Sequence, residues 1–220
     1  RSLYYERRLH DSELGSLQRL RYQQLLRRFR GLESAALESY PVATAVSQED
    51  REALLGLNSS ARIEVIPNGV DVARFTGDTP SVKEAGHIIL FGNMDFLPNS
   101  DAALYFAKEI FPLVLEQYPK ATFSILGTNP EAEIVALASQ DGINVIGEVA
   151  DLRPWLAKSA VSVAPIRFGA GIKNKVLESA AAALPVVCSG RATASLHEEL
   201  RRHLLIADDP RAFANHVVAL

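Results

Sequence analysis

From residue 87 to the end of the chain, short continuous runs of apolar residues alternate with segments of helical periodicity. Continuous apolar runs are typical of strands that are buried on both faces of a parallel sheet. A chain that alternates strand and helix forms right-handed crossover units, so the pattern predicts an α/β fold with a Rossmann-like, doubly wound parallel sheet. The expected strands cover residues 87–91, 122–126, 143–146, 161–164, 185–188 and 203–207.

The segments between these runs contain helix signals. The clearest helix is predicted over residues 99–117, where apolar side chains recur on one face. Asp151 is expected to cap a short helix, and Asp209, which a proline follows, is interpreted as the start of another. Asn129, also followed by a proline, gives the same signal.

The first part of the chain is organised differently. Residues 1–30 carry eight arginines against three acidic residues, and the apolar spacing predicts a long amphipathic helix over residues 13–39. Short strands at 42–46 and 63–66 are expected after it, with a helix between them that Ser47 caps. The arginines of the long helix form either a solvated basic face, which we favour, or a surface for anionic lipid head groups.

Residues 76–86 are polar and contain glycine and proline, so they are the expected linker between two domains. We interpret residues 1–75 as the C-terminal remnant of one domain and residues 87–220 as a second domain. The chain starts with an arginine, and residues 213–220 resemble a helix still in progress. The sequence is therefore interpreted as a fragment whose second domain is truncated at its C-terminus.

The composition excludes several function classes. A net charge of −3 provides no basic field for nucleic acid. No stretch reaches roughly 18–20 continuous apolar residues, so no membrane-spanning helix is expected, and no secretory signal opens the chain. The single cysteine, Cys188, lies in an apolar run, so it is interpreted as a small buried residue. Because a lone cysteine cannot form an internal disulfide, it favours a reducing compartment.

The sequence lacks the familiar nucleotide and metal motifs. A dinucleotide fingerprint fails because Asn174 stands where its third glycine would be. No P-loop sequence is present, and no two aspartates have the D-x-D spacing that holds a metal-bound diphosphate. The five histidines show no ligand spacing with cysteine or carboxylates, so no metal or cofactor is expected.

In a sheet of this kind, ligands bind outside the carboxyl ends of the strands. A glycine closely follows four of the first five runs, and we interpret this recurrence as a need for the backbone to approach a ligand. The residues at these positions are Gly92 with Asn93, Gly127, Gly147 with Glu148 and Val149, and Gly190.

The segment after the fourth run gives the strongest signal. Gly169 and Gly171 precede a predicted helix start, where free amides form an anion site. Lys173 and Lys175 in the first turn oppose the helix dipole, which makes sense if an anion such as a diphosphate binds there. Glu178 can accept hydrogen bonds from ribose hydroxyls. From residue types alone, a plain connection with surface lysines and a surface glutamate is the alternative.

Three stretches are notable for their order. Residues 67–71 (Pro-Asn-Gly-Val-Asp) precede the linker, residues 92–101 (Gly-Asn-Met-Asp-Phe-Leu-Pro-Asn-Ser-Asp) follow the first run, and residues 169–178 (Gly-Ala-Gly-Ile-Lys-Asn-Lys-Val-Leu-Glu) follow the fourth. Together they resemble the interdomain passage, the first donor-domain loop and the donor signature of glycosyltransferase family 4, which belongs to glycosyl transferases group 1 and has the GT-B fold. The resemblance covers roughly residues 40–220.

The resemblance implies two Rossmann-like domains, with a nucleotide-sugar donor on the C-terminal one and a glycan or lipid-linked acceptor on the other. It implies transfer of the sugar with retained anomeric configuration, without an essential metal or a cofactor. Glu178 matches a glutamate that contacts ribose, and Gly92 with Asn93 matches the loop near the phosphates. The other donor-binding residues implied in this way are Gly147, Glu148 and Val149 beside the nucleobase, and Gly169, Ala170, Gly171 and Ile172 around the donor sugar and diphosphate.

The sequence departs from the family pattern in two places. The first glutamate of the family's E-x7-E motif would fall at Ala170, and the arginine and lysine that commonly follow the first strand are replaced by Asn93, Pro98 and Asn99. We hypothesise that other residues supply the positive charge that stabilises the departing diphosphate. The catalytic residues on this hypothesis are Arg167, Lys173 and Lys175.

By this resemblance the expected enzyme is a hexosyltransferase-type glycosyltransferase of bacterial surface polysaccharide or glycolipid synthesis, cytoplasmic and peripheral at the inner face of the cell membrane. The fragment alone is expected to bind nucleotide weakly and not to turn over. Two alternatives stay open: a sugar-nucleotide epimerase of the GT-B fold, and a non-catalytic nucleotide-sugar-binding module, which Ala170 and the missing arginine and lysine favour.

Overall fold

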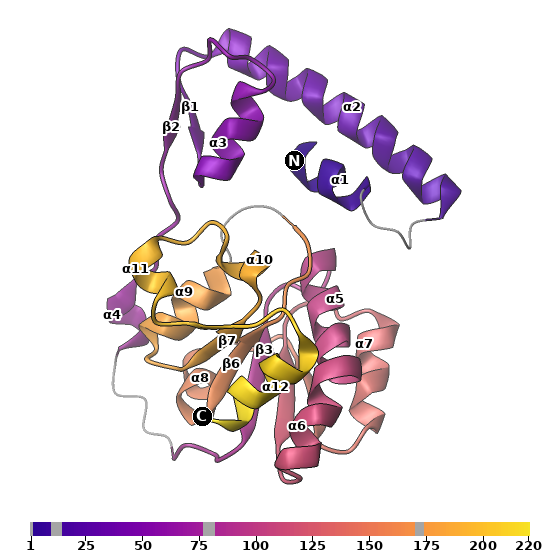
Figure 1. Ribbon diagram of the computed structural model, residues 1–220, viewed down its shortest axis with the longest axis vertical. Helices are drawn as coiled ribbons and strands as arrows, with labels where there is room; N and C mark the ends of the chain where they lie inside the picture. The colour runs from indigo at the N-terminus through magenta and orange to yellow at the C-terminus, as the bar shows by residue number, and fades with distance from the viewer. Residues whose placement is uncertain (1, 10–14, 77–81, 170–173) are drawn as a thin grey trace. The chain divides into compact units, whose positions relative to one another are not determined.

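The protein forms two compact units in its computed structural model, which describes residues 2–9, 15–76, 82–169 and 174–220. The first unit comprises Arg1–Asn68 with Phe168–Ile172, and the second comprises Gly69–Arg167 with Lys173–Leu220. Figure 1 shows the helices and strands of both units. The boundary after Asn68 falls within residues 67–71, the stretch that precedes the expected linker.

The first unit begins with two helices. The helix predicted over residues 13–39 is confirmed from Ser16 onward, while residues 10–14 lie outside the described part of the chain. Tyr40, which follows this helix, is extended, as expected for a residue that precedes proline. The ring of Tyr5 stacks on that of Phe29 with centroids 5.4 Å apart, which joins the two helices. The helices are α1 (Ser2–Leu9) and α2 (Ser16–Ser39).

The rest of the first unit is a small parallel β-α-β element. Its strands pair from Ala43 with Ile63 to Ala45 with Val65. The predicted cap is confirmed, because the Ser47 hydroxyl accepts a hydrogen bond from the backbone N–H of Asp50 at 3.1 Å. The elements are β1 (Ala43–Ala45), α3 (Gln48–Leu55) and β2 (Ile63–Val65).

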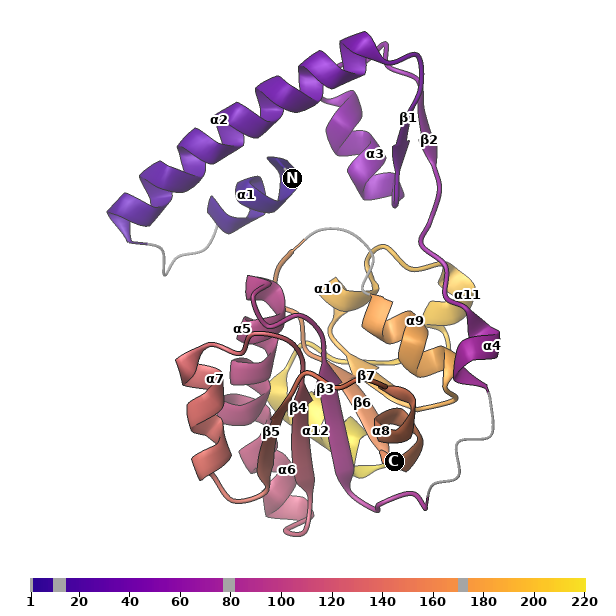
Figure 2. The same ribbon diagram turned by 180° about the vertical axis from the view of Figure 1, so that it is seen from behind.

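The second unit contains a six-stranded, fully parallel sheet, which confirms the predicted fold class. The strand order is β5-β4-β3-β6-β7-β8, so the chain first builds outward from β3 and then returns to build outward on its other side (Figures 1 and 2). This order places a topological switch point between β3 and β6, where sheets of this type bind ligands. The strands are β3 (His87–Phe91), β4 (Thr122–Leu126), β5 (Ile143–Gly147), β6 (Val161–Ala164), β7 (Val186–Cys188) and β8 (Leu205–Ile206).

Helices connect these strands. The first begins the unit and is capped by Asp71, whose carboxylate accepts from the N–H of Arg74. The predicted cap at Asp209 is confirmed, because its carboxylate accepts from the N–H of Ala212. Asp151 accepts from the N–H of Arg153, the first residue of α8 (Arg153–Lys158), but the N-cap position itself is Leu152, which makes no cap bond. The helices are α4 (Val72–Phe75), α5 (Leu97–Tyr105), the π-helix η1 (Phe106–Ile110), α6 (Phe111–Gln117), α7 (Ala132–Ala136), the 3-10 helix η2 (Leu137–Ser139), α8 (Arg153–Lys158), α9 (Asn174–Ala181), α10 (Gly190–Thr193), α11 (Glu198–Arg201) and α12 (Pro210–Val218).

Two helix predictions need correction. The single helix expected over residues 99–117 begins earlier, at Leu97, and contains a π-helical turn before Pro112. Proline cannot donate a ladder hydrogen bond and its ring crowds the preceding turn, so the helix widens there. Asn129 is not a helix cap, because α7 begins after Glu131; Asn129 instead has a φ of 50°, which asparagine tolerates better than most residues.

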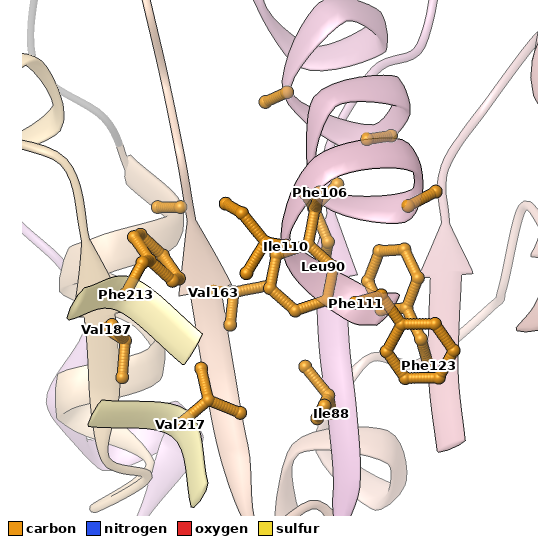
Figure 3. Close-up of a cluster of buried hydrophobic side chains, with 14 of the residues drawn as sticks. Ile88, Leu90, Phe106, Ile110, Phe111, Phe123, Val163, Val187, Phe213 and Val217 are labelled. Carbon is orange, nitrogen blue, oxygen red and sulfur yellow. The ribbon is translucent and has the colours of Figure 1, made fainter. Parts of the chain in front are cut away.

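The core of the second unit lies on both faces of the sheet. Alternate residues of β3 point to opposite faces: Ile88 and Leu90 join one hydrophobic cluster, and Ile89 and Phe91 join another. Figure 3 shows the larger cluster, in which Phe106 lies among side chains from the sheet and from α12. Burial on both faces explains why β3 is a continuous apolar run.

Candidate functional site

The carboxyl end of β3 is shaped by Gly92. This glycine has a φ of 149°, and a Cβ atom added to it would lie 2.8 Å from Nδ2 of Asn99 and 3.3 Å from Nζ of Lys175. A Cβ at this position would therefore clash with the Asn99 amide and press against the Lys175 ammonium. Glycine lets these two side chains pack directly against the end of β3, at the switch point between β3 and β6.

Asn99 and Lys175 form a buried polar pair at this point. The ammonium of Lys175 donates to Oδ1 of Asn99 at 2.7 Å, and Nδ2 of Asn99 donates to the carbonyl oxygen of Asn93 at 2.8 Å. The two residues are only 9% and 7% exposed. Lysine is rarely buried to this degree, because removing its charge from water is costly. The pair brings a positive charge to the end of β3, where the sequence has no arginine or lysine of its own.

Glu178 lies three residues after Lys175 in α9, so the two side chains share a region of the helix surface. Its carboxyl group is half-buried, and this burial raises its pKa, while the positive charges of Arg74 and Lys175 act in the opposite direction. Arg74 comes from α4, at the start of the same unit. The predicted ribose contact is therefore a partly desolvated carboxylate in the field of two cations.

Arg167 is anchored to α5. Its guanidinium donates to both carboxylate oxygens of Asp101, with Nε 2.9 Å from Oδ2, and lies over the ring of Tyr105 at 4.7 Å from the centroid. A two-point pair with carboxylate fixes the orientation of an arginine. Arg167 therefore contacts the helix that follows β3, the same helix that carries Asn99.

Several predicted site residues fall elsewhere. Gly169 is buried, has a φ of 115° and groups with the first unit. Four of the residues predicted to form the anion site at the helix start lie outside the described part of the chain. These residues are Ala170, Gly171, Ile172 and Lys173.

The loop after β5 holds the predicted nucleobase contacts. Gly147 has a φ of 80°, and nothing lies within 4 Å of a Cβ built there, so its surroundings are open. Glu148 is exposed, and Val149 packs against the smaller hydrophobic cluster. Asp151 follows, and hydrogen bonds from Arg153 lower its carboxyl pKa to about 2. The loop therefore combines an open backbone with an aspartate whose pKa is lowered by its arginine neighbour.

The recurring glycines have more than one cause. A Cβ on Gly127 would lie 1.8 Å from the carbonyl oxygen of Gly92, so Gly127 is required by the packing of one strand end on another. A Cβ on Gly190 would lie 3.0 Å from the carboxylate of Asp208. The interpretation that each glycine marks an approach to a ligand is therefore wrong for Gly127, whose space is filled by backbone.

The remaining candidates for chemistry are structural. Cys188 is fully buried in β7, and this burial raises its thiol pKa to about 12, which confirms the interpretation of a small core residue.

Among the described residues, no three or more histidine, cysteine or carboxylate side chains gather as ligands for a metal ion. Within the same part of the chain, no helix combines the length and the apolar character needed to cross a bilayer.

From the sequence, Asn99 is only a departure from a family pattern, and Asp101 and Arg74 have no predicted role. No local signal marks Asn99, because its importance depends on a contact with a lysine 76 residues later in the sequence. Asp101 could have been found as a carboxylate in the first turns after a strand end. Arg74 lies in a four-residue helix that residue patterns did not predict.

Comparison with known proteins gives a family and a fold. The family described as Glycosyl transferases group 1 matches residues 85–220. No curated protein sequence matches the chain.

Solved structures resemble the chain at low sequence identity. The pneumococcal O-GlcNAc transferase GtfA, in complex with UDP and GlcNAc, is 15% identical with a TM-score of 0.68, over 88% of this chain and 40% of that one. TarM is 13% identical with a TM-score of 0.70, over 96% of this chain and 41% of that one. A structure of S. aureus TarM is also similar. Anabaena HepE, in complex with UDP and glucose, is 15% identical with a TM-score of 0.64, over 86% and 57%. These likenesses confirm the Rossmann-like GT-B fold class, and the chain spans 40–57% of the length of these proteins.

Proposed function

The chain belongs to the glycosyl transferases group 1 family, and on this basis we propose that it is the donor-binding part of a retaining glycosyltransferase. The enzyme transfers a hexose from a nucleoside-diphosphate sugar to a hydroxyl of a glycan or lipid-linked acceptor. Because the neighbouring structures named above contain UDP, UDP is the first nucleotide to test.

One observation carries this proposal: the ammonium of Lys175 lies at the carboxyl end of β3, beside Gly92 and bonded to Asn99. A buried cation at the switch point of a Rossmann-like sheet matches the requirement of a diphosphate. A Cβ at Gly92 would displace the Asn99 amide that holds the ammonium, which accounts for the glycine there.

The residues have separate roles in the proposed step. The bond between the anomeric carbon and the diphosphate oxygen breaks with its electron pair on the diphosphate, and a bond from the acceptor oxygen to the same carbon forms. The proton of the acceptor hydroxyl passes to an oxygen of the departing diphosphate, so the products are the glycoside and the nucleoside diphosphate. Lys175 stabilises the negative charge that develops on the leaving group, with Arg167 and Lys173 as the further cations. Glu178 accepts from the ribose hydroxyls, and the loop at residues 147–149 holds the base.

The first unit is proposed to belong to the acceptor-side domain, because residues 1–75 precede the linker region at 76–86 in the order expected for GT-B enzymes. The second unit carries Gly92, Lys175 and Glu178, on which the proposed donor site rests. We therefore expect the chain to bind nucleotide and to transfer sugar only with the remainder of an acceptor domain.

We further propose that α2 contacts an anionic membrane surface at the inner face of the cell membrane, which makes the enzyme a cytoplasmic peripheral protein. Leu17 and Leu20 are 82% and 53% exposed, and Arg21 and Arg28 lie on the same helix face at helical spacing. An apolar and basic face is typical of helices that lie on anionic lipid. Vesicles that contain phosphatidylserine should sediment the chain, vesicles of phosphatidylcholine alone should not, and Arg21→Gln with Arg28→Gln should abolish the difference.

The donor site is proposed to work without a metal or cofactor, because lysine and backbone groups take the role that a divalent cation has in other transferases. Calorimetric titration with UDP should give the same dissociation constant with and without EDTA. A loss of affinity on chelation would contradict this part of the proposal.

The central test of the proposal is nucleotide binding by the chain. UDP and GDP should be titrated calorimetrically, and one of them should bind. Glu178→Ala should lower the affinity for the nucleotide that binds more tightly by about tenfold, since a carboxylate that accepts two hydroxyl hydrogen bonds is removed. The control is Glu116→Ala, which removes an exposed glutamate on α6 that pairs with Arg211.

A second measurement tests the reaction. The anomeric configuration of the sugar in the product, determined by NMR with an acceptor domain present, should be that of the donor. Failure of both nucleotides to bind, or binding that Glu178→Ala leaves unchanged, would contradict the proposed function. An inverted product would contradict only the retaining mechanism.

A further inference from the structure

Asn99 is the least expected member of the polar cluster at the end of β3. It lies in the first turn of α5, after β3, whereas Lys175 lies in the first turn of α9, after β6. Strands β3 and β6 are neighbours in the sheet, so the bond between these side chains links the two helix starts that border the switch point.

The two partners of Asn99 determine how its amide is oriented. A backbone carbonyl can only accept a hydrogen bond, and an ammonium can only donate one. The carbonyl of Asn93 therefore selects the NH2 group, and Lys175 selects the oxygen, which is the arrangement in the structure. An aspartate would direct an oxygen at the carbonyl of Asn93, and an apolar residue would bond to neither group. Asparagine therefore fits both of these contacts.

The same amide fixes the position of a flexible side chain. Lysine has four rotatable side-chain bonds and loses considerable entropy when it is held in one place. The bond to Asn99 holds its ammonium against the end of β3, close enough that a Cβ on Gly92 would lie 3.3 Å from Nζ. The orientation is thus set before any ligand arrives, which is the condition under which electrostatic stabilisation is most effective.

We infer that Asn99 is a positioning residue: its amide, fixed by the carbonyl of Asn93, holds the Lys175 ammonium where it meets the diphosphate of the donor. This inference rests on the proposed function. Asn99 and Lys175 together replace the arginine and lysine that sequence resemblance led us to expect after the first strand. Asn99 acts through Lys175 and does not itself need to touch the nucleotide.

The test is a double-mutant cycle on the chain, read out with two probes. UDP carries the diphosphate, and uridine lacks it. Lys175→Met should weaken UDP about 10- to 100-fold, and Asn99→Ala about fivefold. For both variants the affinity for uridine, measured by NMR titration, should stay within about twofold of the wild-type value. In the presence of Lys175→Met, Asn99→Ala should have no further effect on UDP.

Two surface variants and one isosteric variant serve as controls. Lys108→Met removes a lysine that pairs with Glu133, and Asn215→Ala removes an amide that bonds to Gln117; neither should change UDP binding. Asn99→Asp has nearly the shape of the wild type but neutralises the ammonium and faces the Asn93 carbonyl. It should weaken UDP at least as much as Asn99→Ala, and it is the variant to use if Asn99→Ala unfolds.

The outcomes separate the inference from the function on which it rests. If Asn99→Ala weakens UDP by the same factor with and without Lys175, or weakens uridine equally, Asn99 has only a structural role and the inference is wrong. If the wild-type chain prefers neither UDP over uridine nor GDP over guanosine, no diphosphate contact exists, and the proposed function fails together with the inference. If Lys175→Met alone weakens UDP, the function stands and the positioning role is wrong.

Discussion

The two ends of β3 each hold a buried polar side chain, and the two are satisfied in different ways. At the amino end, His87 is 2% exposed, and both of its ring nitrogens lie near serine hydroxyls. At the carboxyl end, Lys175 is 7% exposed, and its ammonium lies next to a glycine. The first group lies between hydroxyls, whereas the second donates to an amide oxygen.

The amino end is closed by side chains of the same unit. Nε2 of His87 lies 2.8 Å from Oγ of Ser124, and Nδ1 lies 3.3 Å from Oγ of Ser159. Burial lowers the pKa of His87, the charge of Lys158 acts in the same direction, and Glu84 opposes them. A neutral histidine between two hydroxyls stabilises the sheet and offers nothing to a ligand.

The carboxyl end holds a basic group instead. The ammonium of Lys175 donates to the neutral amide of Asn99, and a Cβ on Gly92 would lie 3.3 Å from it. Because burying a charge is costly, such an arrangement is expected where an anion binds. The two ends of β3 therefore show that burial alone does not identify a functional polar group; the chemistry of the group and of its partners does.

The largest effect is expected from Gly127→Ala, which tests whether the carboxyl end is open throughout. Its Cβ would lie 1.8 Å from the carbonyl oxygen of Gly92, so the strand ends must separate. Denaturant unfolding should show a loss of about 3 kcal/mol. Gly147→Ala meets no atom within 4 Å and should cost about 1 kcal/mol from its positive φ alone. Equal losses would show that the space beside Gly127 is not filled.

The next effect separates stability from binding. His87→Ala removes two buried hydrogen-bond partners and should lower the free energy of unfolding by about 2 kcal/mol, with UDP affinity unchanged. Lys175→Met should lower the UDP affinity and leave the free energy of unfolding nearly unchanged. Replacing a buried ion by an apolar side chain of similar size is often neutral for stability. Denaturant unfolding and calorimetry on both variants measure this, and a shared pattern of losses would remove the distinction between the two ends.

A smaller effect concerns pH. The folded protein binds a proton at His87 less readily than the unfolded chain, whose histidine has a pKa of about 6.5. The unfolded state therefore gains protons first, and stability falls as pH drops below about 6.5, until the lower folded pKa is reached. Unfolding between pH 7 and 5 should show a steeper loss for the wild type than for His87→Gln. Parallel profiles would show that His87 does not titrate differently on folding.

The smallest effect is expected from Glu178→Gln. Burial raises the pKa of this carboxyl in the folded protein. At neutral pH the carboxylate is therefore less favourable in the folded state than in the unfolded state. Removing the charge should raise the free energy of unfolding slightly at neutral pH while it weakens UDP. A loss of stability at neutral pH would indicate that Arg74 and Lys175 outweigh the burial.

The strands were the most predictable part of the fold. Three of them, at residues 87–91, 122–126 and 161–164, match the prediction to the residue, because burial on both faces leaves a continuous apolar run. Helix details were less predictable. The π-helical turn before Pro112 and the positive φ of Asn129 depend on how neighbouring segments pack, which local patterns do not record.

The candidate site was predictable in type more than in geometry. The sequence indicated Lys175 as a cation near an anion site, because a lysine in the first turn of a helix opposes the helix dipole. It did not indicate where the ammonium lies. The position of its ammonium depends on Asn99, 76 residues away, and on the space left by Gly92. Such a contact exists only after β3 and β6 pair, so no local pattern could reveal it.

The most direct test of the account is a crystal structure of the chain with UDP. The account predicts a phosphate oxygen about 2.7–2.9 Å from Nζ of Lys175, with the bond from Lys175 to Asn99 retained. A diphosphate bound away from the carboxyl end of β3, or a Lys175 side chain turned from it, would contradict the account.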